Sequence, residues 1–355
     1  MEFVANVLSG LWADTRAVLS NPFDPNSRIF WLYLISSTVA AYFVYRSVRK
    51  RDLSEKRTDA EAAKGSFVQY LFPKSVWSHP SAWLDLRYAL FHRILMQSLL
   101  GALGGVSLVL GYKLISGQWV IETFASGNPT TFTGWLGAGI FMFITMIIMD
   151  LGAWFLHFLQ HKVPVLWQFH KVHHSAEVMH PISNFREHPI DNITYTFFLG
   201  FLYGIIYALA VQWLGFLPSM PSLLGVPLLM FLFNLVAYNL RHSHVWLRWP
   251  GVWSIVFPSP AHHHVHHSCH PDHIDKNFAF MFPVWDVIFG TYEMPEDNQK
   301  VKFGVTAGDD ADLDSVFRLY WVPFRDAYRV VKRARKKRSK MNAPEADTVG
   351  MSPDP

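Results

Sequence analysis

Histidine is the residue type that stands out in this 355-residue chain, which contains 18 of them. Sixteen lie between His157 and His273, and only His79 and His92 fall outside that stretch. Imidazole nitrogens bind transition metals such as iron, zinc, copper and nickel. So dense a concentration predicts a metal site rather than unrelated core or surface histidines.

Three groups of histidines are spaced so that their side chains can share a helix face. Residues three and four apart on a helix are neighbours, with Cβ atoms about 5–6 Å apart. The first group is a pair at i and i+4, and the other two groups show i, i+3, i+4 spacing and end in the same sequence, H-x-V-H-H-S, at 170–175 and 263–268. This repeat predicts two similar half-sites. The principal candidate ligands are His157, His161, His170, His173, His174, His263, His266 and His267.

Two further histidines are weaker candidates for metal ligands. His188 stands in the sequence Arg-Glu-His-Pro, just before the apolar segment 193–216, and His242 follows the apolar segment 222–241. His244 lies two residues after His242 and would point to a different face of a helix. We therefore expect at most one of this pair to bind metal, and favour His242.

Eight to ten imidazoles are too many for one four-coordinate centre and suit two metals with open positions. A zinc hydrolase typically carries its general base in an H-E-x-x-H sequence, which this chain lacks. A metal transporter would need ionisable residues inside its spans, and the long apolar runs contain none that are charged. These observations favour a pair of redox-active irons. The alternative is a non-catalytic membrane protein whose histidines bind zinc for sensing or assembly.

The segments that carry the histidines are expected to be membrane helices. Hydrophobic residues make up 51% of the chain and charged residues 16%, against roughly 25% charged in a typical soluble domain. A membrane helix needs about 20 apolar residues. Four runs lack Asp, Glu, Lys and Arg, and the last is long enough for a helical hairpin; they cover 29–45, 94–112, 123–149 and 192–240.

The fold class predicted from these runs is all-α, a polytopic membrane helical bundle with a cytoplasmic helical cap that carries the histidines. About five spans are expected, at 29–46, 92–114, 132–156, 193–216 and 222–241. The single cysteine, Cys269, excludes an internal disulfide framework and a cysteine-based zinc site. The net charge of +4 gives no reason to expect nucleic-acid binding.

The distribution of Lys and Arg predicts the orientation of the chain. The segments 46–57 and 329–340 carry six and eight basic residues, whereas the 117–131 and 216–221 loops carry none. Because basic residues are enriched in cytoplasmic loops, an outside N-terminus would place both basic segments and the sixteen clustered histidines on the cytoplasmic side. No cleavable signal peptide is expected in the first 20 residues.

The ordered histidine groups resemble the histidine boxes of the fatty acid hydroxylase/sterol desaturase superfamily of membrane di-iron enzymes. HFLQH at 157–161 looks like the HX3–4H box, HKVHH at 170–174 like the first HXXHH box, and HHVHH at 263–267 like the last. The surrounding sequences are similar too, at 163–169 (VPVLWQF), 184–191 (NFREHPID), 275–278 (DKNF) and 285–291 (WDVIFGT). One departure is the box before the last, usually HX3H, where only Asn239, His242 and His244 stand.

The resemblance covers about 130–292 and implies a division of the chain into four parts. These are an amphipathic N-terminal segment (1–27), an N-terminal transmembrane region with a basic cytoplasmic loop (28–129), a catalytic domain like that of the superfamily (130–292), and a basic cytoplasmic tail, partly disordered (293–355). Within the tail, the aromatic residues of 312–340 suit an interfacial helix held by anionic lipid. A solvated tail is the alternative.

The resemblance also implies the activity. It points to a membrane oxidoreductase that uses O2 to hydroxylate, or desaturate, an unactivated C–H bond of a lipid such as a sterol or fatty acyl chain. Two iron ions would be the cofactor, held by the eight principal histidines with His188 and His242, and no catalytic residue is expected beyond these ligands. Nearby carboxylates, Asp150, Glu187, Asp191 and Asp275, are expected to orient ring N–H groups.

The partners implied are the lipid substrate and a separate electron donor on the cytosolic side, cytochrome b5-like or ferredoxin-like, since no haem domain is expected at either end. The expected location is a bacterial inner membrane or the endoplasmic reticulum membrane. Hydroxylation is favoured over desaturation.

Overall fold

The computed structural model describes residues 2–50, 61–119, 131–296, 300–305 and 312–341. The described chain is mostly helical with almost no strand, which confirms the all-α prediction. The only strands in these ranges, β1 (Ser222–Leu223) and β2 (Val226–Pro227), form a short antiparallel hairpin. The α-helices are α1 (Glu2–Ser20), α2 (Trp31–Lys50), α3 (Phe67–Leu71), α4 (Lys74–Trp77), α5 (Pro80–Ser116), α6 (Phe132–Lys162), α7 (Pro164–His174), α8 (Pro189–Leu214), α9 (Leu228–Leu235), α10 (Trp253–Val256), α11 (Pro260–His266), α12 (Val284–Phe289) and α13 (Val316–Met341). Five short 3-10 helices join them, namely η1 (Asn21–Phe23), η2 (Ala62–Lys64), η3 (Pro181–Phe185), η4 (Tyr238–Leu240) and η5 (Pro271–His273).

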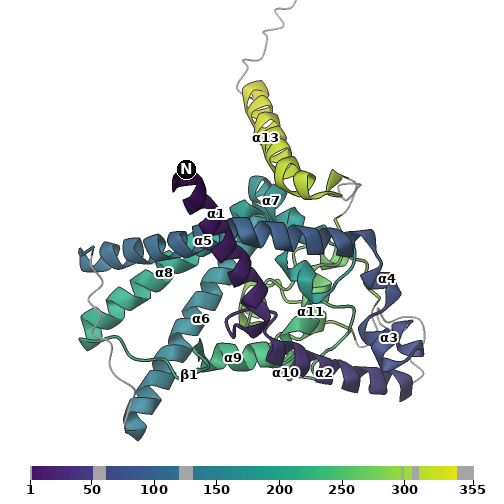
Figure 1. Ribbon diagram of the computed structural model, residues 1–355, viewed down its shortest axis with the longest axis horizontal. Helices are drawn as coiled ribbons and strands as arrows, with labels where there is room; N and C mark the ends of the chain where they lie inside the picture. Colours follow the sequence, from purple (N-terminus) through teal and green to yellow (C-terminus); the bar gives the residue numbers. More distant parts are fainter. Residues whose placement is uncertain (1, 51–60, 120–130, 297–299, 306–311, 342–355) are drawn as a thin grey trace, which may run out of the picture.

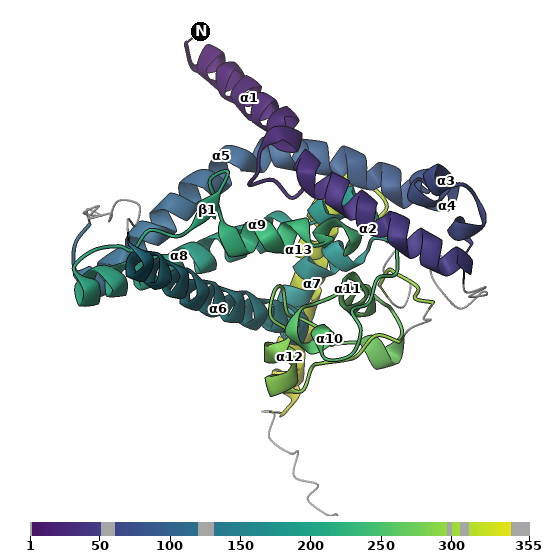
Figure 2. The same cartoon turned by 90° about the horizontal axis from the view of Figure 1, so that it is seen from below.

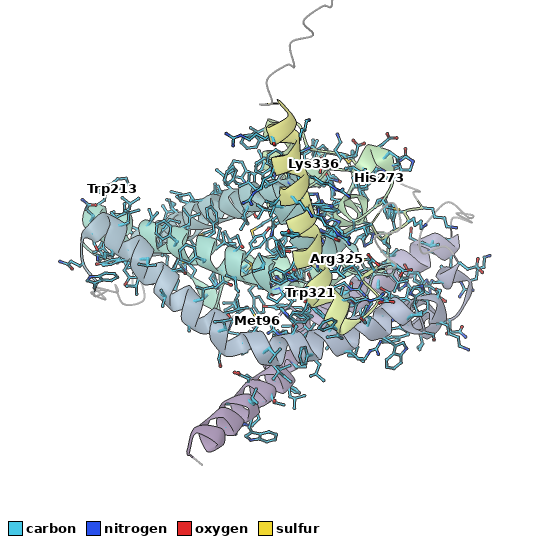
Figure 3. All side chains as sticks on the ribbon, turned by 90° about the horizontal axis from the view of Figure 1, so that it is seen from above. Met96, Trp213, His273, Trp321, Arg325 and Lys336 are labelled. Atoms are coloured by element: carbon cyan, nitrogen blue, oxygen red, sulfur yellow. The ribbon has the colours of Figure 1, made fainter. Side chains whose placement is uncertain are left out.

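Among the described residues, three helices, α5, α6 and α8, are long and apolar enough to cross a membrane. The 37 residues of α5 measure about 55 Å at 1.5 Å per residue, well beyond the roughly 30 Å of a bilayer core. The three helices extend together to one side, while α7 and α11 lie at their other end (Figure 1). Figure 3 shows the same polarity, with Trp213 at the end of α8 far from His273. The long helices therefore carry their polar ends beyond the apolar layer, into the part that holds the histidines.

The fifth expected span is corrected by the structure. The segment 222–241 contains the β-hairpin, then α9, and then a break at Ala237, whose φ is 57°. The eight residues of α9 measure only about 12 Å, too short to cross a bilayer. Its apolar residues are used inside the protein, where Met230 and Phe233 pack beside Met142 and Met146 of α6. The absence of charge therefore reflects in part contacts inside the protein, while Leu232 and Val236 remain exposed.

The first expected span forms a helix, α2, but this helix is not among those long and apolar enough to cross a membrane. It ends in Arg49 and Lys50, at the start of the predicted basic loop, most of which lies outside the described residues. Residues 120–130, in the predicted uncharged loop, and residues 342–355, predicted to be disordered, also lie outside them.

The C-terminal helix α13 packs against α7, the helix that carries one of the histidine boxes. Lys171 Nζ of α7 lies 2.8 Å from the Asp326 carboxylate, and Leu319 and Val322 are buried beside Val172. Its opposite side exposes aromatic residues such as Trp321, labelled in Figure 3 with Arg325 and Lys336. At the other terminus, α1 projects from the body (Figure 2).

The helices α5 and α8 approach each other closely through glycines. A Cβ atom at Gly111 would collide with the carbonyl oxygen of Phe201, and one at Gly204 would collide with that of Leu108. Small residues of this kind let membrane helices pack backbone to backbone. The C-terminal half of α5 is therefore packed tightly against α8.

Replacing Gly111 with alanine is expected to destabilise the protein by about 1–3 kcal/mol, because the added methyl group must push the two backbones apart. The measurement is the midpoint of thermal unfolding in detergent. Gly105→Ala on the same helix is the matched control, because a Cβ atom there has nothing within 4 Å. Equal midpoints for the two variants would contradict the close packing.

Candidate metal centre

Two consecutive helices bring together five of the predicted ligands. His157 and His161 occupy the last turns of α6, and the chain then turns at Val163, which has extended backbone angles. Pro164 begins α7 at its first position, where the missing N–H costs nothing and the fixed φ suits a helix. The short helix carries His170, His173 and His174 back toward α6. The tight connection places the two histidine boxes face to face.

The last box lies on α11, a helix of seven residues with a well-defined start. Ser259 caps it and Pro260 follows at the first helical position. His262 belongs to this cap, because its Nδ1 lies 2.7 Å from the Ser259 hydroxyl. The remaining turns present His263, His266 and His267 toward the other boxes.

Nine of the ten predicted ligands fall into two groups, within each of which the potential ligand atoms lie within 4.8 Å of one another. The first group has five histidines, and the second, which contains His242, has four. The first group is His157, His161, His170, His174 and His266; the second is His173, His242, His263 and His267. Figure 2 shows α7 and α11, which supply most of these residues, next to each other, and their histidine rings are in contact.

The two groups agree with the predicted pair of similar half-sites, and each HXXHH box is divided between them. Histidines at i and i+4 point the same way and go to one group, whereas the histidine at i+3 goes to the other. Consecutive side chains of a helix are rotated by about 100° from each other. The histidines at i+3 and i+4 therefore point in directions about 100° apart. Each box therefore contributes to both groups and holds them side by side.

The first group presents five imidazole nitrogens inward. The Nε2 atoms of all five rings are buried and have no hydrogen-bond partner. A buried polar atom without a partner costs free energy. A metal ion bound between the converging rings would give each of these nitrogens a partner. The residues present therefore fit a metal ion.

Acceptors behind the rings fix the direction of these nitrogens. His157 Nδ1 donates to the carbonyl oxygen of Phe278 at 2.9 Å, and His266 Nδ1 donates to that of Lys276 at 2.8 Å. His170 Nδ1 lies 3.3 Å from the Asp191 carboxylate, and His161 Nδ1 lies 3.4 Å from that of Asp275. Each of these acceptors holds the proton on Nδ1 and leaves the Nε2 lone pair facing the group.

The second group converges more tightly. His263 Nε2 lies 2.9 Å from His242 Nε2 and 3.1 Å from His267 Nε2. Nitrogens bound to one ion at about 2.1 Å are about 3 Å apart, so these separations also fit a metal ion. His173 Nδ1 donates to the carbonyl oxygen of Arg186 at 3.3 Å, and His242 Nδ1 lies 3.0 Å from Ser183 Oγ. His263 differs, because its Nδ1 faces a donor, the Arg241 guanidinium, at 3.2 Å.

Burial keeps these imidazoles neutral. Removal from water lowers the pKa of His170 to about 3 and, together with the nearby His170 ring, that of His173 to about 4. Burial, with neighbouring cationic or imidazole groups, also lowers the pKa values of His263 and His267 well below the ordinary value. Neutral imidazole is the form that binds a metal, so the rings are ready to bind at neutral pH.

A strained turn supplies three of the acceptors. Asp275 and Asn277 have φ angles of 61° and 56°, a region that non-glycine residues rarely adopt without support. The support comes from Asp286, whose carboxylate accepts from the backbone N–H groups of Phe278 and Ala279, each at 2.9 Å. The DKNF and WDVIFGT sequences thus form one unit that orients ligands.

Two of the four carboxylates expected to orient ring N–H groups have other partners. Asp150 accepts from the backbone N–H groups of Met281 and Phe282 and so fastens the closing segment to α6. Glu187 pairs with Arg28 at 3.1 Å. Burial alone would raise the pKa of Glu187, but Arg28 and other nearby groups lower it to about 2.

The structure does not bring His188, the tenth predicted ligand, into either group. Its Nδ1 accepts from the N–H of Ile190 at the start of α8, and its Nε2 donates to the carbonyl oxygen of Tyr320 at 3.1 Å. Both nitrogens are therefore engaged. His244 is also separate, with its Nε2 2.7 Å from the carbonyl oxygen of Tyr70, as the preference for His242 requires.

Sequence reasoning missed the acceptors that are backbone carbonyl groups, those of Arg186, Lys276 and Phe278. Nothing in a side-chain pattern identifies a carbonyl group as an acceptor. The surrounding sequences, REHP and DKNF, were the available signal, because they lie beside the boxes without containing enough ligands of their own.

A cavity of about 580 Å³ leads from the long helices to the two histidine groups. Apolar residues of α5, α6 and α8 line one part, including Leu100, Met146 and Leu199, and His157 and His173 line another. A volume of this size accommodates part of a lipid-sized ligand. The arrangement can therefore bring an apolar chain to both histidine groups.

Comparison with known proteins finds similarity to enzymes that are named as lipid monooxygenases, hydroxylases and desaturases. The family model "Fatty acid hydroxylase" matches residues 142–291. Human alkylglycerol monooxygenase is 32% identical over 158 residues, which are 44% of this chain and 31% of that protein. Ornithine lipid hydroxylase of Rhizobium tropici is 29% identical over 165 residues (45% and 44%), and Delta(7)-sterol 5(6)-desaturase of Aspergillus fumigatus is 25% identical over 180 residues (46% and 51%). The chain thus spans about a third to a half of the length of these relatives, and no solved structure matches it significantly.

Proposed function

The chain belongs to the fatty acid hydroxylase/sterol desaturase superfamily through residues 142–291, and on this basis we propose that it is a membrane oxidoreductase that uses O2 to hydroxylate an unactivated C–H bond of a lipid. The observation that carries the proposal is the pair of histidine groups beside an apolar cavity. The relatives that match the same part of the chain are named as monooxygenase, hydroxylase and desaturase.

Two iron ions are the proposed cofactor, one for each histidine group. A structural zinc site is closed by four ligands, whereas the first group offers five imidazoles and the second offers four more. This excess argues against the alternative of a zinc-binding protein without catalytic activity. When bound, the irons supply the electrons with which O2 is activated for attack on a C–H bond.

The remaining work belongs to the residues of the chain. The carbonyl groups of Lys276 and Phe278, with Asp191 and Asp275, hold the protons of four rings of the first group on Nδ1, so that the Nε2 atoms of these rings face inward. The apolar lining on α5, α6 and α8 takes the lipid chain and excludes water from the reacting carbon. Electrons are proposed to come from a separate donor of the cytochrome b5 or ferredoxin kind on the cytoplasmic side.

Desaturation is the second candidate reaction, because one of the matched relatives is named a desaturase. Both reactions begin with removal of hydrogen from a C–H bond. We favour hydroxylation because the relatives with higher identity are named as a monooxygenase and a hydroxylase.

Isotope labelling tests the proposal. Purified, iron-loaded protein with a reductase system and 18O2 is expected to place one labelled oxygen atom in a lipid product, with none entering from labelled water. A product with a new double bond and no label would identify a desaturase. Lipid turnover that continues unchanged without O2 or without iron would refute the proposed reaction.

A further inference from the structure

Among the described residues that line the cavity, one guanidinium group has a buried nitrogen without a hydrogen-bond partner. Arg93 of α5 lines the cavity, and its Nε is buried without a hydrogen-bond partner. The side chain is held by Asn21, whose Oδ1 accepts from Nη2 at 3.3 Å, and by the ring of Phe185, whose centroid lies 5.1 Å from the guanidinium carbon. No ion pair to Arg93 is found within the described residues, and both of these contacts are with neutral groups.

The other two arginines that line the cavity are engaged. Arg28 forms an ion pair with Glu187 at 3.1 Å. Arg241 donates to the carbonyl oxygen of Phe280 at 2.8 Å and faces His263. Each of them therefore supports a wall of the cavity, and Arg93 is the cation that remains to meet a ligand.

The cavity has a polar end and an apolar end, arranged along the long helices. Arg93 is the last charged residue of α5 before the charge-free run 94–112, and Asn192 begins the corresponding run of α8. One helical stretch of seven residues further on, about 10 Å at 1.5 Å per residue, Leu100 and Leu199 line the same cavity. The polar end thus lies at the level where α5 and α8 become uniformly apolar. An occupant that matches both ends is an amphiphile.

We propose that the cavity selects lipids with an anionic head group, a phosphate or a carboxylate, whose oxygen atoms accept hydrogen bonds from Arg93 while the chain lies along α5 and α8. The planar guanidinium group suits oxyanions, and hydrogen bonds between charged groups are stronger than those between neutral ones. This proposal names a substrate class for the proposed lipid oxidation and rests on that proposed function. Lipid binding can be measured separately from lipid oxidation.

Equilibrium binding to the full chain in neutral detergent is the experiment. The probes are three radiolabelled single-chain lipids of equal chain length, a neutral glycerol ether, its phosphate ester and a fatty carboxylate. The wild type is expected to bind at least one anionic probe about 10–100-fold more tightly than the neutral one, and this preference should shrink as salt rises. The anionic probe that binds more tightly shows whether the site prefers a phosphate or a carboxylate.

Arg93→Gln is expected to abolish the preference for the anionic probes, while Arg87→Gln, the same change at an exposed position of α5, leaves it intact. Arg93→Lys keeps the charge and should retain part of the preference, which decides the question if the glutamine variant does not fold. A wild type without preference for either anionic probe, or a folded Arg93→Gln protein that keeps it, overturns the proposal. Binding through Arg93 without any oxidation would instead refute the proposed reaction and leave this assignment standing.

Discussion

Replacing His267 with alanine is expected to lower the metal content of the iron-loaded protein from about two ions to about one per chain and to reduce lipid oxidation to background. His267 belongs to the group with four histidines, which has no spare ligand. Loss of a residue that only orients a ligand typically weakens metal binding by about 10–100-fold, so loss of a ligand should cost at least as much. Metal analysis of the purified protein, together with the labelling assay, measures both effects.

His270→Ala is the matched control for this variant. His270 lies three residues further on, its side chain is 61% exposed, and it belongs to neither group. It should keep both ions and full turnover. Far-ultraviolet circular dichroism should be unchanged in both variants, because the long helices are held by their own packing. An alanine variant of His267 that retains two ions, or a control that loses one, would contradict the assignment of the second group.

The sequence was most informative where the chemistry depends on side-chain spacing. The i, i+4 and i, i+3, i+4 patterns identified the three boxes, and the structure places His242, the preferred candidate, in the second group while His244 contacts Tyr70. The same spacing could not show that the i+3 histidine of each box joins the other group. That division depends on the crossing of α6, α7 and α11, which no local pattern specifies.

Charge-free runs predicted α5, α6 and α8 but also suggested a span at 222–241. Composition does not distinguish an apolar segment that faces lipid from one that is buried in protein, and Phe231 and Phe233 of α9 are of the second kind. His188, predicted as an additional ligand, lies outside both groups. A histidine beside a box can equally cap a helix, and His188 caps α8.

The polar network behind the second group was also beyond sequence reasoning, because its members are distant in the chain. Arg186 is 1% exposed. Its guanidinium group pairs with Asp85 of α5 and donates to the carbonyl oxygens of Ser81 and Ser175, each at 3.0 Å. Its own carbonyl oxygen accepts from His173 Nδ1. One residue thus ties α5 and α7 to a proposed metal ligand.

Replacing Arg186 with methionine is therefore expected to destabilise the protein by about 3–5 kcal/mol. The side chain of Asp85 is fully buried, and among the described residues it would keep only His180 Nε2, at 3.0 Å, as a side-chain partner. Removing one member of a buried ion pair leaves an uncompensated charge, whereas replacing both members with apolar residues is often neutral. The double variant Arg186→Met, Asp85→Leu should accordingly recover much of the loss. Unfolding in detergent measures both effects.

Arg318→Met provides the control for the loss of an arginine, because its ion pair with Asp314 is exposed and such pairs contribute about 0–1 kcal/mol. If Arg186→Met unfolded at the same midpoint as this control, the buried pair would not be holding α5 to the histidine-bearing part. If the double variant were stable yet lost metal from the second group, the carbonyl group of residue 186 would have moved. In that case the role of Arg186 is to position His173, separately from its contribution to stability.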